Sequence, residues 1–253
     1  MSRHAELAAA FGLLTRLPTG WIADPAERPD PARAVWAYPF AGLAVGAISG
    51  GVYWLTHVIG VPSFIAGVFA LGSMVLATGA MHEDGAADTA DGLGGGADRA
   101  GKLEIMRDSR IGTYGVIALI LIFALRLSVI GTLADAALVA AALMATAALS
   151  RGAIVPLMHW LGPARADGLA VHVGQAGRNA TAEAAAIAAL TAFLLLPFAT
   201  ALAAILAAAI GAAIVGLLAR SQLGGQTGDI LGAACVAAEC AALTAIVSIT
   251  APG

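Results

Sequence analysis

Residues 34–81 read AVWAYPFAGLAVGAISGGVYWLTHVIGVPSFIAGVFALGSMVLATGAM and contain no Lys, Arg, Asp or Glu. A transmembrane helix needs about 20 consecutive, mostly apolar residues, so this segment is long enough for two. Pro62 and the Val-Ile-Gly sequence at 58–60 provide a turn between them. The segment therefore predicts a pair of helices in a lipid bilayer.

The composition of the whole chain supports this prediction. Its 253 residues are 60% hydrophobic and 11% charged, with a mean hydropathy of +0.88. A soluble globular protein carries about 25% charged residues, and no water-soluble core could hide so much apolar surface. The net charge of -3 and the lack of a basic face argue against nucleic acid as a partner. Cys235 and Cys240 have no metal or disulfide spacing.

Five further apolar segments predict the rest of the protein. They are 112–131, 134–160, the two parts of 184–219 that Pro197 separates, and 230–249. The predicted fold is all-α, a polytopic integral membrane helical bundle of about seven transmembrane helices. We expect one membrane domain over residues 1–253, because no soluble domain is visible.

The basic residues predict the orientation of this bundle, since cytoplasmic loops are enriched in Lys and Arg. With seven spans, one side receives the N-terminus and the loops 82–111, 161–183 and 220–229. These segments hold every Lys and Arg except Arg126 and Arg151. We therefore expect the N-terminus and these loops in the cytoplasm and the C-terminus outside.

The segment 82–111 is the one polar island in the chain, and three aspartates lie near its start. Asp84, Asp88 and Asp91 are spaced i, i+4, i+7 and would share one face of a helix. Like charges on one face repel, so we expect a compensating cation, and Mg²⁺ commonly binds carboxylates together with substrate phosphates. The alternative is a solvated acidic loop, which the surrounding Gly and Ala disfavour. His82 is either a catalytic base or a histidine without a role.

Glycines and basic residues follow the aspartates. Gly94 and Gly95 lie in a glycine-rich run whose backbone N–H groups could approach an anion closely. Arg99 and Lys102 come next. We interpret this run as a phosphate-binding loop, although glycines also end helices.

The segment KLEIMRDSR at 102–110 has two interpretations that its spacing leaves open. It is either a salt-bridged amphipathic helix at the membrane surface or part of a substrate site. In the second case Arg107 or Arg110 would bind phosphate beside Ser109, and Asp108 would bind metal or orient an arginine.

A second polar cluster, GGQTGD at 224–229, lies in the loop 220–229 before the last predicted span. Thr227 and Asp229 fit a helix N-terminus, but that explanation leaves the glycines unexplained. We therefore expect Thr227 and Gly228 to bind substrate and Asp229 to act in catalysis. If the seventh span returns beside the second, both polar clusters face one cleft.

Three charged residues fall inside predicted spans, where a bare charge is costly. We expect Glu239 to pair with Arg126 or Arg151. The alternative is an ion path in a transporter. The carboxylates, however, crowd at one surface, and no paired inverted halves are visible.

These motifs resemble the cobalamin 5′-phosphate synthase family, whose members are also called adenosylcobinamide-GDP ribazoletransferases. The resemblance keeps the family's order over nearly the whole chain. It rests on Phe11 with Thr15-Arg16-Leu17-Pro18, Tyr38-Pro39 with Gly42 and Gly46, His82–Gly92, Leu103–Gly115, Ala164–Leu169 and Gly224–Ala234. The sequence departs from the family pattern at Glu83, where an apolar residue is usual.

The resemblance implies a Mg²⁺-dependent enzyme of the bacterial inner membrane with a cytoplasmic active site. It would join adenosylcobinamide-GDP to α-ribazole or its 5′-phosphate and release GMP, which is phosphoryl transfer from a pyrophosphate. Asp84, Asp88 and Asp91 are expected to bind the metal. Arg99, Arg107 and Arg110 are expected to stabilise the departing GMP. Asp108 or Asp229 is expected to orient or deprotonate the ribose hydroxyl.

A rival enzyme class is the CDP-alcohol phosphotransferases. Their motif begins well at Asp88–Gly92, but the arginine and later aspartates that it requires do not follow. Whether the chain forms a homo-oligomer is left open by the sequence.

Overall fold

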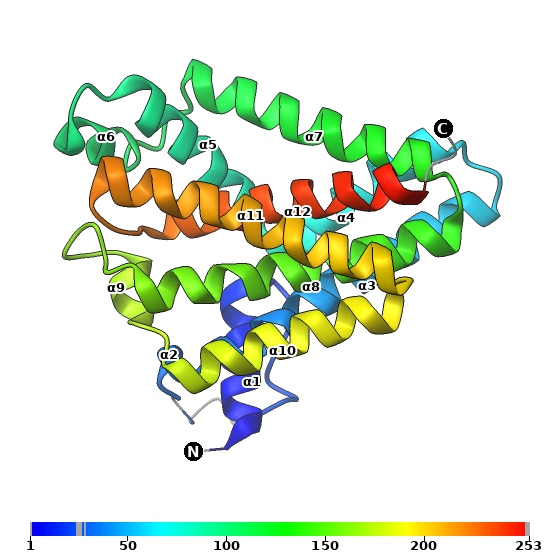
Figure 1. Cartoon of the computed structure of the whole chain (residues 1–253), viewed down its shortest axis with the longest axis horizontal. Coiled ribbons are helices and arrows are strands. Elements are labelled where there is room, and N and C mark those ends of the chain that lie inside the picture. Colours follow the sequence, from blue (N-terminus) through cyan, green and yellow to red (C-terminus); the bar gives the residue numbers. More distant parts are fainter. Residues whose placement is uncertain (1, 24–26, 28, 251–253) are drawn as a thin grey trace.

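The computed structural model of this chain describes residues 2–23, 27 and 29–250. These residues form helices joined by short loops, with no β-strand among them (Figure 1). The first and last residues of the predicted domain, Met1 and 251–253, lie outside the described residues. The helices are α1 (Arg3–Leu14), α2 (Pro31–Ala34), η1 (Val35–Ala37), α3 (Tyr38–Val58), α4 (Ser63–Thr78), α5 (Met81–Gly95), α6 (Arg99–Ile105), α7 (Thr113–Leu133), α8 (Ala136–Trp160), α9 (Leu169–Val173), α10 (Arg178–Leu195), α11 (Phe198–Leu223) and α12 (Gly228–Thr250).

Five segments of the described chain are long and apolar enough to cross a membrane. They are Pro31–Val58, which ends with α3, and the helices α7, α8, α11 and α12. A sixth candidate is α4 together with α5, which are bent by 89° relative to each other. The chain is therefore a multi-pass membrane protein with five or six candidate spans, and the predicted number of seven is not confirmed.

The difference from seven lies in α4 and α10. α4 has 16 residues and is a candidate span only together with α5, a polar helix of 15 residues. α10 covers the predicted fifth span but is not among the candidates, because its 18 residues begin with Arg178 and Asn179 and include Glu183. The described structure contains no membrane, so it does not test the predicted orientation.

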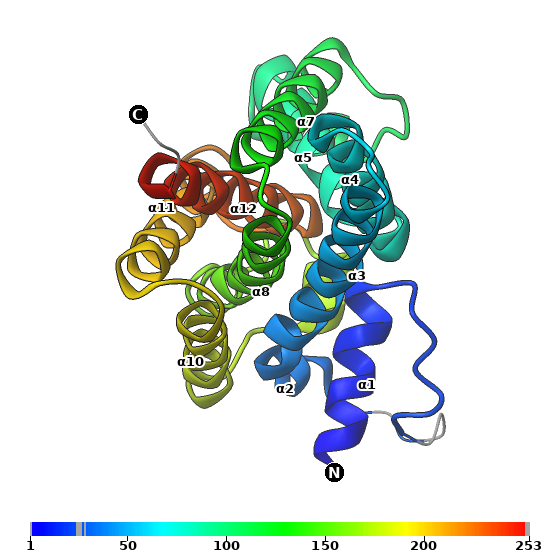
Figure 2. The same cartoon turned by 90° about the vertical axis from the view of Figure 1, so that its right-hand side faces the viewer.

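The long helices run in similar directions, and α8 lies at their centre (Figure 2). α3, α10, α11 and α12 all pack against α8. α5, α6 and α9 gather at one end of the bundle, and the C-terminus lies at the other end (Figure 1). The segments that the sequence analysis singled out as polar therefore lie together at one end.

Glycines allow the closest of these helix contacts. Gly42, Gly46 and Gly50 form a stripe on α3 that faces α8. A Cβ atom at Gly46 would lie 2.6 Å from the carbonyl oxygen of Leu143 and from the Cα atom of Met144. Membrane helices associate through van der Waals packing, which such close approach strengthens. This contact explains two of the glycines in the family motif at Tyr38–Gly46.

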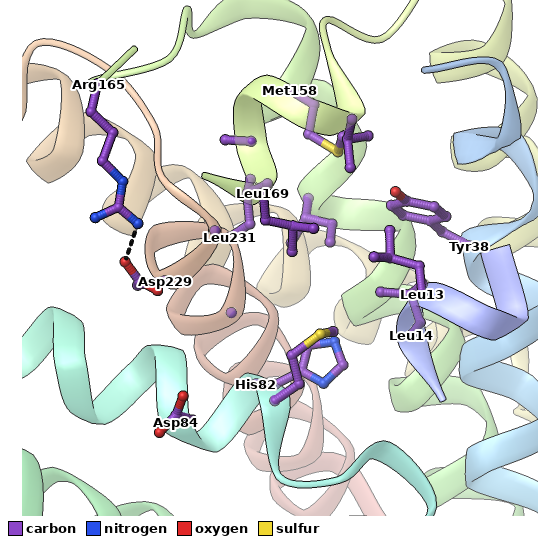
Figure 3. A pocket seen from close by; sticks show the side chains of 16 residues that line it. Leu13, Leu14, Tyr38, His82, Asp84, Met158, Arg165, Leu169, Asp229 and Leu231 are labelled. Atoms are coloured by element: carbon purple, nitrogen blue, oxygen red, sulfur yellow. Dashed lines mark hydrogen bonds and ion pairs between the residues drawn. The ribbon is translucent and has the colours of Figure 1, made fainter. Parts of the chain in front are cut away.

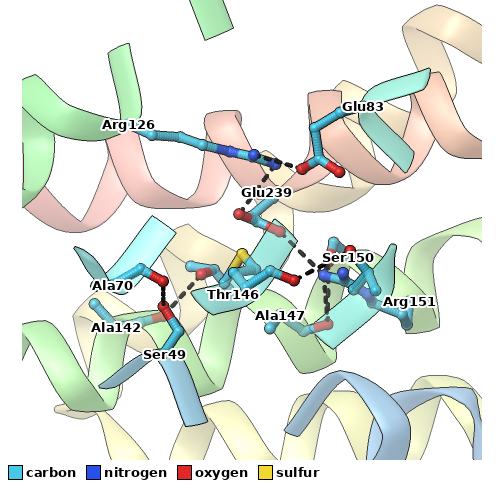
Figure 4. Close-up of polar contacts among 12 residues, drawn as sticks. Ser49, Ala70, Glu83, Arg126, Ala142, Thr146, Ala147, Ser150, Arg151 and Glu239 are labelled. Carbon is cyan, nitrogen blue, oxygen red and sulfur yellow. Dashed lines mark hydrogen bonds and ion pairs between the residues drawn. The ribbon is translucent and has the colours of Figure 1, made fainter. Parts of the chain in front are cut away.

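A buried network of four charged side chains joins four helices (Figure 4). Arg126 of α7 contacts Glu83 of α5 at 2.8 Å and Glu239 of α12 at 3.1 Å. Glu239 also contacts Arg151 of α8 at 3.0 Å. All four side chains are at most 7% exposed. Two positive and two negative charges leave the network neutral, which is what a low-dielectric interior requires.

This charged network confirms one prediction and extends it. Glu239 was expected to pair with Arg126 or Arg151, and it pairs with both. Glu83, the position at which the sequence departs from the family pattern, supplies the fourth charge.

We predict that Gly46→Ala lowers the free energy of unfolding by roughly 1–3 kcal/mol, the usual cost of overpacking a tight contact. The added methyl group would force α3 and α8 apart. Thermal unfolding of the purified protein in detergent would measure the change. Gly51→Ala is the matched control on the same helix, since a Cβ atom there meets nothing within 4 Å. Equal melting temperatures for the two variants would contradict the prediction.

Removing one member of the charged network should be costly. Arg126→Leu leaves Glu83 and Glu239 without their shared partner, and breaking a buried ion pair costs about 3–5 kcal/mol. The double variant Glu83→Leu/Arg126→Leu keeps the neutral pair of Glu239 and Arg151, so it should recover much of the lost stability. If the double variant melts at or below the temperature of Arg126→Leu, the charges are not coupled in this way.

Candidate active site

α5 leaves α4 through a sharp turn made by two residues in the left-handed conformation. Gly79 and Ala80 have φ angles of 66° and 60°, and alanine adopts this conformation only at an energetic cost. The turn produces the 89° bend between the two helices. α5 is thereby directed so that its aspartates approach the start of α12.

α5 and α12 meet backbone to backbone at two glycines. A Cβ atom at Gly85 would lie 2.9 Å from the carbonyl oxygen of Asp229. A Cβ atom at Gly232 would lie 3.2 Å from the carbonyl oxygen of His82. This contact brings Asp84 and Asp229 to the lining of one cavity. Residues of the two polar clusters therefore meet at one cavity.

The aspartates at this meeting point repel one another. Burial is the largest cause that raises the pKa of Asp88, to about 6. The negative charges of Asp84, Asp229 and Asp91 add to the shift, and Arg165 opposes it. The carboxylate cluster thus carries more negative charge than its protein surroundings neutralise.

Arg165 is a site residue that the sequence analysis did not select. Its guanidinium group lies 3.3 Å from the Asp229 carboxylate. Two backbone hydrogen bonds hold the loop that carries Arg165 against the start of α12. The Ala164 N–H donates to the Gln226 carbonyl at 2.8 Å, and the Gln226 N–H donates to the Gly162 carbonyl at 2.9 Å. The signal for Arg165 was the family motif Ala164–Leu169, which carried no recognisable chemistry by itself.

Thr227 caps α12, as one interpretation of its sequence predicted. Its hydroxyl accepts a hydrogen bond from the Ile230 N–H at 3.2 Å and donates to Asp229 at 3.2 Å. Gly228 lines the same cavity as Asp84 and Asp229. Substrate binding by Thr227 and Gly228 stays a prediction.

Asp91 differs from the other two aspartates of α5. Its carboxylate accepts hydrogen bonds from the backbone N–H groups of Gly112 at 2.7 Å and Gly115 at 2.8 Å. These groups belong to the N-terminus of α7, where a negative charge is favourable. Asp91 therefore fixes α7 to α5, and its predicted role as a metal ligand is not tested by this geometry.

The predicted phosphate-binding loop is wrong in its local structure, because the chain is helical through Gly95. The glycines serve packing instead. A Cβ atom at Gly92 would lie 2.9 Å from the Lys102 carbonyl oxygen, and one at Gly94 would lie 2.8 Å from the ring of Tyr114. In a helix the N–H groups of this run already have backbone partners. Substrate binding by Gly94 and Gly95 stays a prediction.

The first two predicted phosphate-binding residues contact the protein itself. Arg99 donates hydrogen bonds to the carbonyl oxygens of Leu223 at 2.7 Å and Ala164 at 2.5 Å. Lys102 donates to the side chain of Gln222 at 2.6 Å. Both residues therefore hold α6 to the end of α11.

The segment after α6 is exposed and salt-bridged. Arg107 pairs with Asp167, and Arg110 pairs with Asp108 at 2.6 Å. The hydrogen bond from Arg110 lowers the pKa of Asp108 to about 2. Ser109 lines a hollow of about 240 Å³ together with Asp84 and Asp88. Of the predicted residues in 107–110, Ser109 is thus the one that the structure places beside the carboxylate cluster.

Two further predictions concern His82 and the metal. His82 lines the cavity that Asp84 and Asp229 share. Among the residues that the structure describes, no group of three or more His, Cys, Asp or Glu is arranged to hold a metal ion. Asp84 and Asp88 nevertheless offer oxygen donors of the kind that Mg²⁺ prefers, so the metal site stays a prediction.

The fold and the site define a class of protein: a multi-pass membrane protein with a cluster of carboxylates and one arginine where two helices meet. No solved structure matches this chain. The family model described as cobalamin-5-phosphate synthase matches residues 6–247. The chain belongs to this family.

Curated relatives support the same assignment over most of their length. The protein named adenosylcobinamide-GDP ribazoletransferase in Bradyrhizobium diazoefficiens is 46% identical to this chain. The match covers 90% of this chain and 88% of the relative. In Azorhizobium caulinodans the identity is 42%, over 91% of this chain and 92% of the relative. In Rhizobium johnstonii it is 42%, over 95% of each chain.

We predict that Asp91→Ala destabilises the protein whereas Asp88→Ala does not. Asp91 makes two hydrogen bonds to backbone donors, and a hydrogen bond to a charged group contributes about 1.5–3 kcal/mol. Asp88→Ala instead removes a repelled charge. Thermal unfolding of both variants in detergent would measure the difference. A lower melting temperature for Asp88→Ala than for Asp91→Ala would contradict the assignment.

Proposed function

We propose that this protein joins adenosylcobinamide-GDP to α-ribazole or α-ribazole 5′-phosphate, forming adenosylcobalamin or its 5′-phosphate and releasing GMP. The observation that carries this proposal is the contact of α5 with α12, which gathers Asp84, Asp229 and Arg165 around one cavity. The family match over residues 6–247 supports the same reaction.

The chemistry is phosphoryl transfer from a pyrophosphate. A ribose hydroxyl of the ribazole attacks the phosphorus that is bonded to the cobinamide, a new P–O bond forms, and the P–O bond to the departing GMP breaks. The hydroxyl proton passes to a base. Such a reaction depends on positioning and on neutralisation of phosphate charge more than on covalent help from the protein.

Asp84 and Asp88 are the proposed ligands of Mg²⁺, with Asp229 beside them. Burial is the main cause of the raised pKa of Asp88, and the negative charges of Asp84, Asp229 and Asp91 add to it. A bound cation would relieve the repulsion among these carboxylates, which supports the assignment. Bound Mg²⁺ would supply charge stabilisation to the pyrophosphate oxygens. Asp91 contributes by fixing α7, since both of its oxygens already accept backbone hydrogen bonds.

The proposed proton acceptor is Asp229, which lies at the cavity, in preference to Asp108, which is half-buried and paired with Arg110. Arg165 holds Asp229 in place and is the first candidate to bind a phosphate oxygen. Arg99 and Lys102 position α6 and α11, while Arg107 and Arg110 lie on the exposed segment where they could reach the departing GMP.

The proposed topology has seven spans, with the N-terminus and the active site on the cytoplasmic side of the inner membrane. The helices would be α3, α4, α7, α8, α10, α11 and α12, with α5 at the inner surface. The distribution of Lys and Arg supports this orientation, because nearly all of them lie in the segments on one side.

The proposed function is tested by Asp88→Asn in purified protein. GMP release from adenosylcobinamide-GDP and α-ribazole should fall by at least about 100-fold, the scale expected for loss of a transition-state charge contact. EDTA should abolish GMP release by the unchanged protein, and added Mg²⁺ should restore it. Glu104→Gln is the matched control, since Glu104 is exposed on α6 and belongs to no part of the site.

Two outcomes would contradict the proposal. Normal GMP release by Asp88→Asn would remove the metal assignment. No GMP release by the unchanged protein with Mg²⁺ and both substrates would overturn the function itself.

A further inference from the structure

A cavity of about 140 Å³ lies beside the carboxylate cluster, enclosed by α1, α3, α5, α8, α9 and α12. Its two sides differ in chemistry (Figure 3). Asp84, Asp229 and Arg165 lie on one side, and Leu13 and Leu14 of α1 lie on the other. A ligand that fits both sides has a compact apolar part joined to a polar part that reacts.

His82 adds a hydrogen-bonding group to the cavity. Its side chain points into the cavity between the charged side and the apolar side (Figure 3). It is 2% exposed, and neither ring nitrogen has a hydrogen-bond partner among the described residues. A buried polar group without a partner destabilises a folded protein, so natural structures contain few of them. An imidazole held in this state indicates a partner that comes with a ligand.

We propose that this cavity binds the benzimidazole base of α-ribazole, with the free ring nitrogen of the base hydrogen-bonded to His82. This inference rests on the proposed function. The flat, apolar ring would lie among Met158, Leu169 and Tyr38, and the ribose would extend toward Asp84 and Asp229, where its hydroxyl reacts. Pockets of this kind, apolar with a few placed polar groups, are typical of small-molecule sites.

The other parts of the two substrates fit the cavity less well. A corrin ring is far larger than about 140 Å³. Guanine carries several hydrogen-bonding groups, and those that face the side lined by Leu13, Leu14 and Met158 would be left unpaired, which weakens binding. The benzimidazole base has only one free ring nitrogen, and His82 offers one N–H donor to match it.

The first test fills the cavity. Ala170 lines it and is 5% exposed, whereas the next residue, Val171, is 40% exposed. Ala170→Phe should weaken equilibrium binding of α-ribazole, measured by calorimetry in detergent, by about tenfold or more, since overpacking a closed site is costly. The KM for α-ribazole should rise similarly, while the KM for adenosylcobinamide-GDP stays within about twofold. Val171→Phe is the matched control and should bind α-ribazole as the unchanged protein does.

The second test removes the hydrogen-bonding atoms of His82 and keeps a ring. His82→Phe should weaken α-ribazole binding by about tenfold. Its melting temperature should stay the same or rise, because an unpartnered polar group has been replaced by an apolar one. A purely structural role for His82 would instead lower the melting temperature and leave the affinity of the folded fraction unchanged. His172→Phe, at an exposed position of α9, is the control.

The outcomes separate this inference from the proposed function. If the unchanged protein binds and converts α-ribazole, but Ala170→Phe and His82→Phe bind it with unchanged affinity, the base binds elsewhere and the cavity assignment is overturned. If the unchanged protein neither binds α-ribazole nor releases GMP, the proposed function fails and the cavity assignment fails with it.

Discussion

The neutral charged network of Glu83, Arg126, Glu239 and Arg151 is the constraint on which the site depends. It ties the first turn of α5 to three long helices. Successive residues of a helix point about 100° apart, so fixing Glu83 toward Arg126 also fixes the direction of its neighbour Asp84. The place of Asp84 in the cavity lining and the close contact at Gly85 agree with this direction of α5.

The acidic side chains of α5 are of two kinds: some pair with other groups of the protein, and others have no partner in it. Glu83 and Asp91 have strong protein partners, an arginine and two backbone N–H groups. The carboxylates of Asp84 and Asp88 form no hydrogen bond or ion pair within the residues that the structure describes. A single short helix thus combines structural anchors with reactive groups, and the anchors flank the reactive ones. This arrangement holds unpaired charge in place without neutralising it.

The sequence predicted the long helices well because apolar runs and prolines determine them directly. The breaks at Pro62 and Pro197 were expected, as was the pairing of Glu239 inside the membrane. The glycine-rich stretch 92–96 was predicted wrongly as a loop, since the chain is helical through Gly95. Glycine commonly ends helices, but here close packing against Lys102 and Tyr114 requires it inside one.

Two other features could not be read from spacing. Arg165 gives no periodic signal, and its position depends on backbone hydrogen bonds between 162–164 and Gln226, distant in the chain. The bonds from Arg99 to the carbonyl oxygens of Leu223 and Ala164 depend on the same loop closure. Contacts of this kind are set by tertiary structure, so a basic residue near a glycine run cannot be assigned to phosphate from sequence alone.

The order of the charged network along the chain has a consequence for biogenesis. Glu83, Arg126 and Arg151 are synthesised before Glu239, which lies on α12. Until α12 enters the bilayer, Arg126 has Glu83 as its partner but Arg151 lacks Glu239. An unmatched arginine inside a membrane helix costs about 2.5–3.5 kcal/mol. Insertion of α12 removes that excess charge. A chain that stops before α12 would keep an unneutralised arginine in lipid, a defect that membrane proteases and insertion chaperones could recognise.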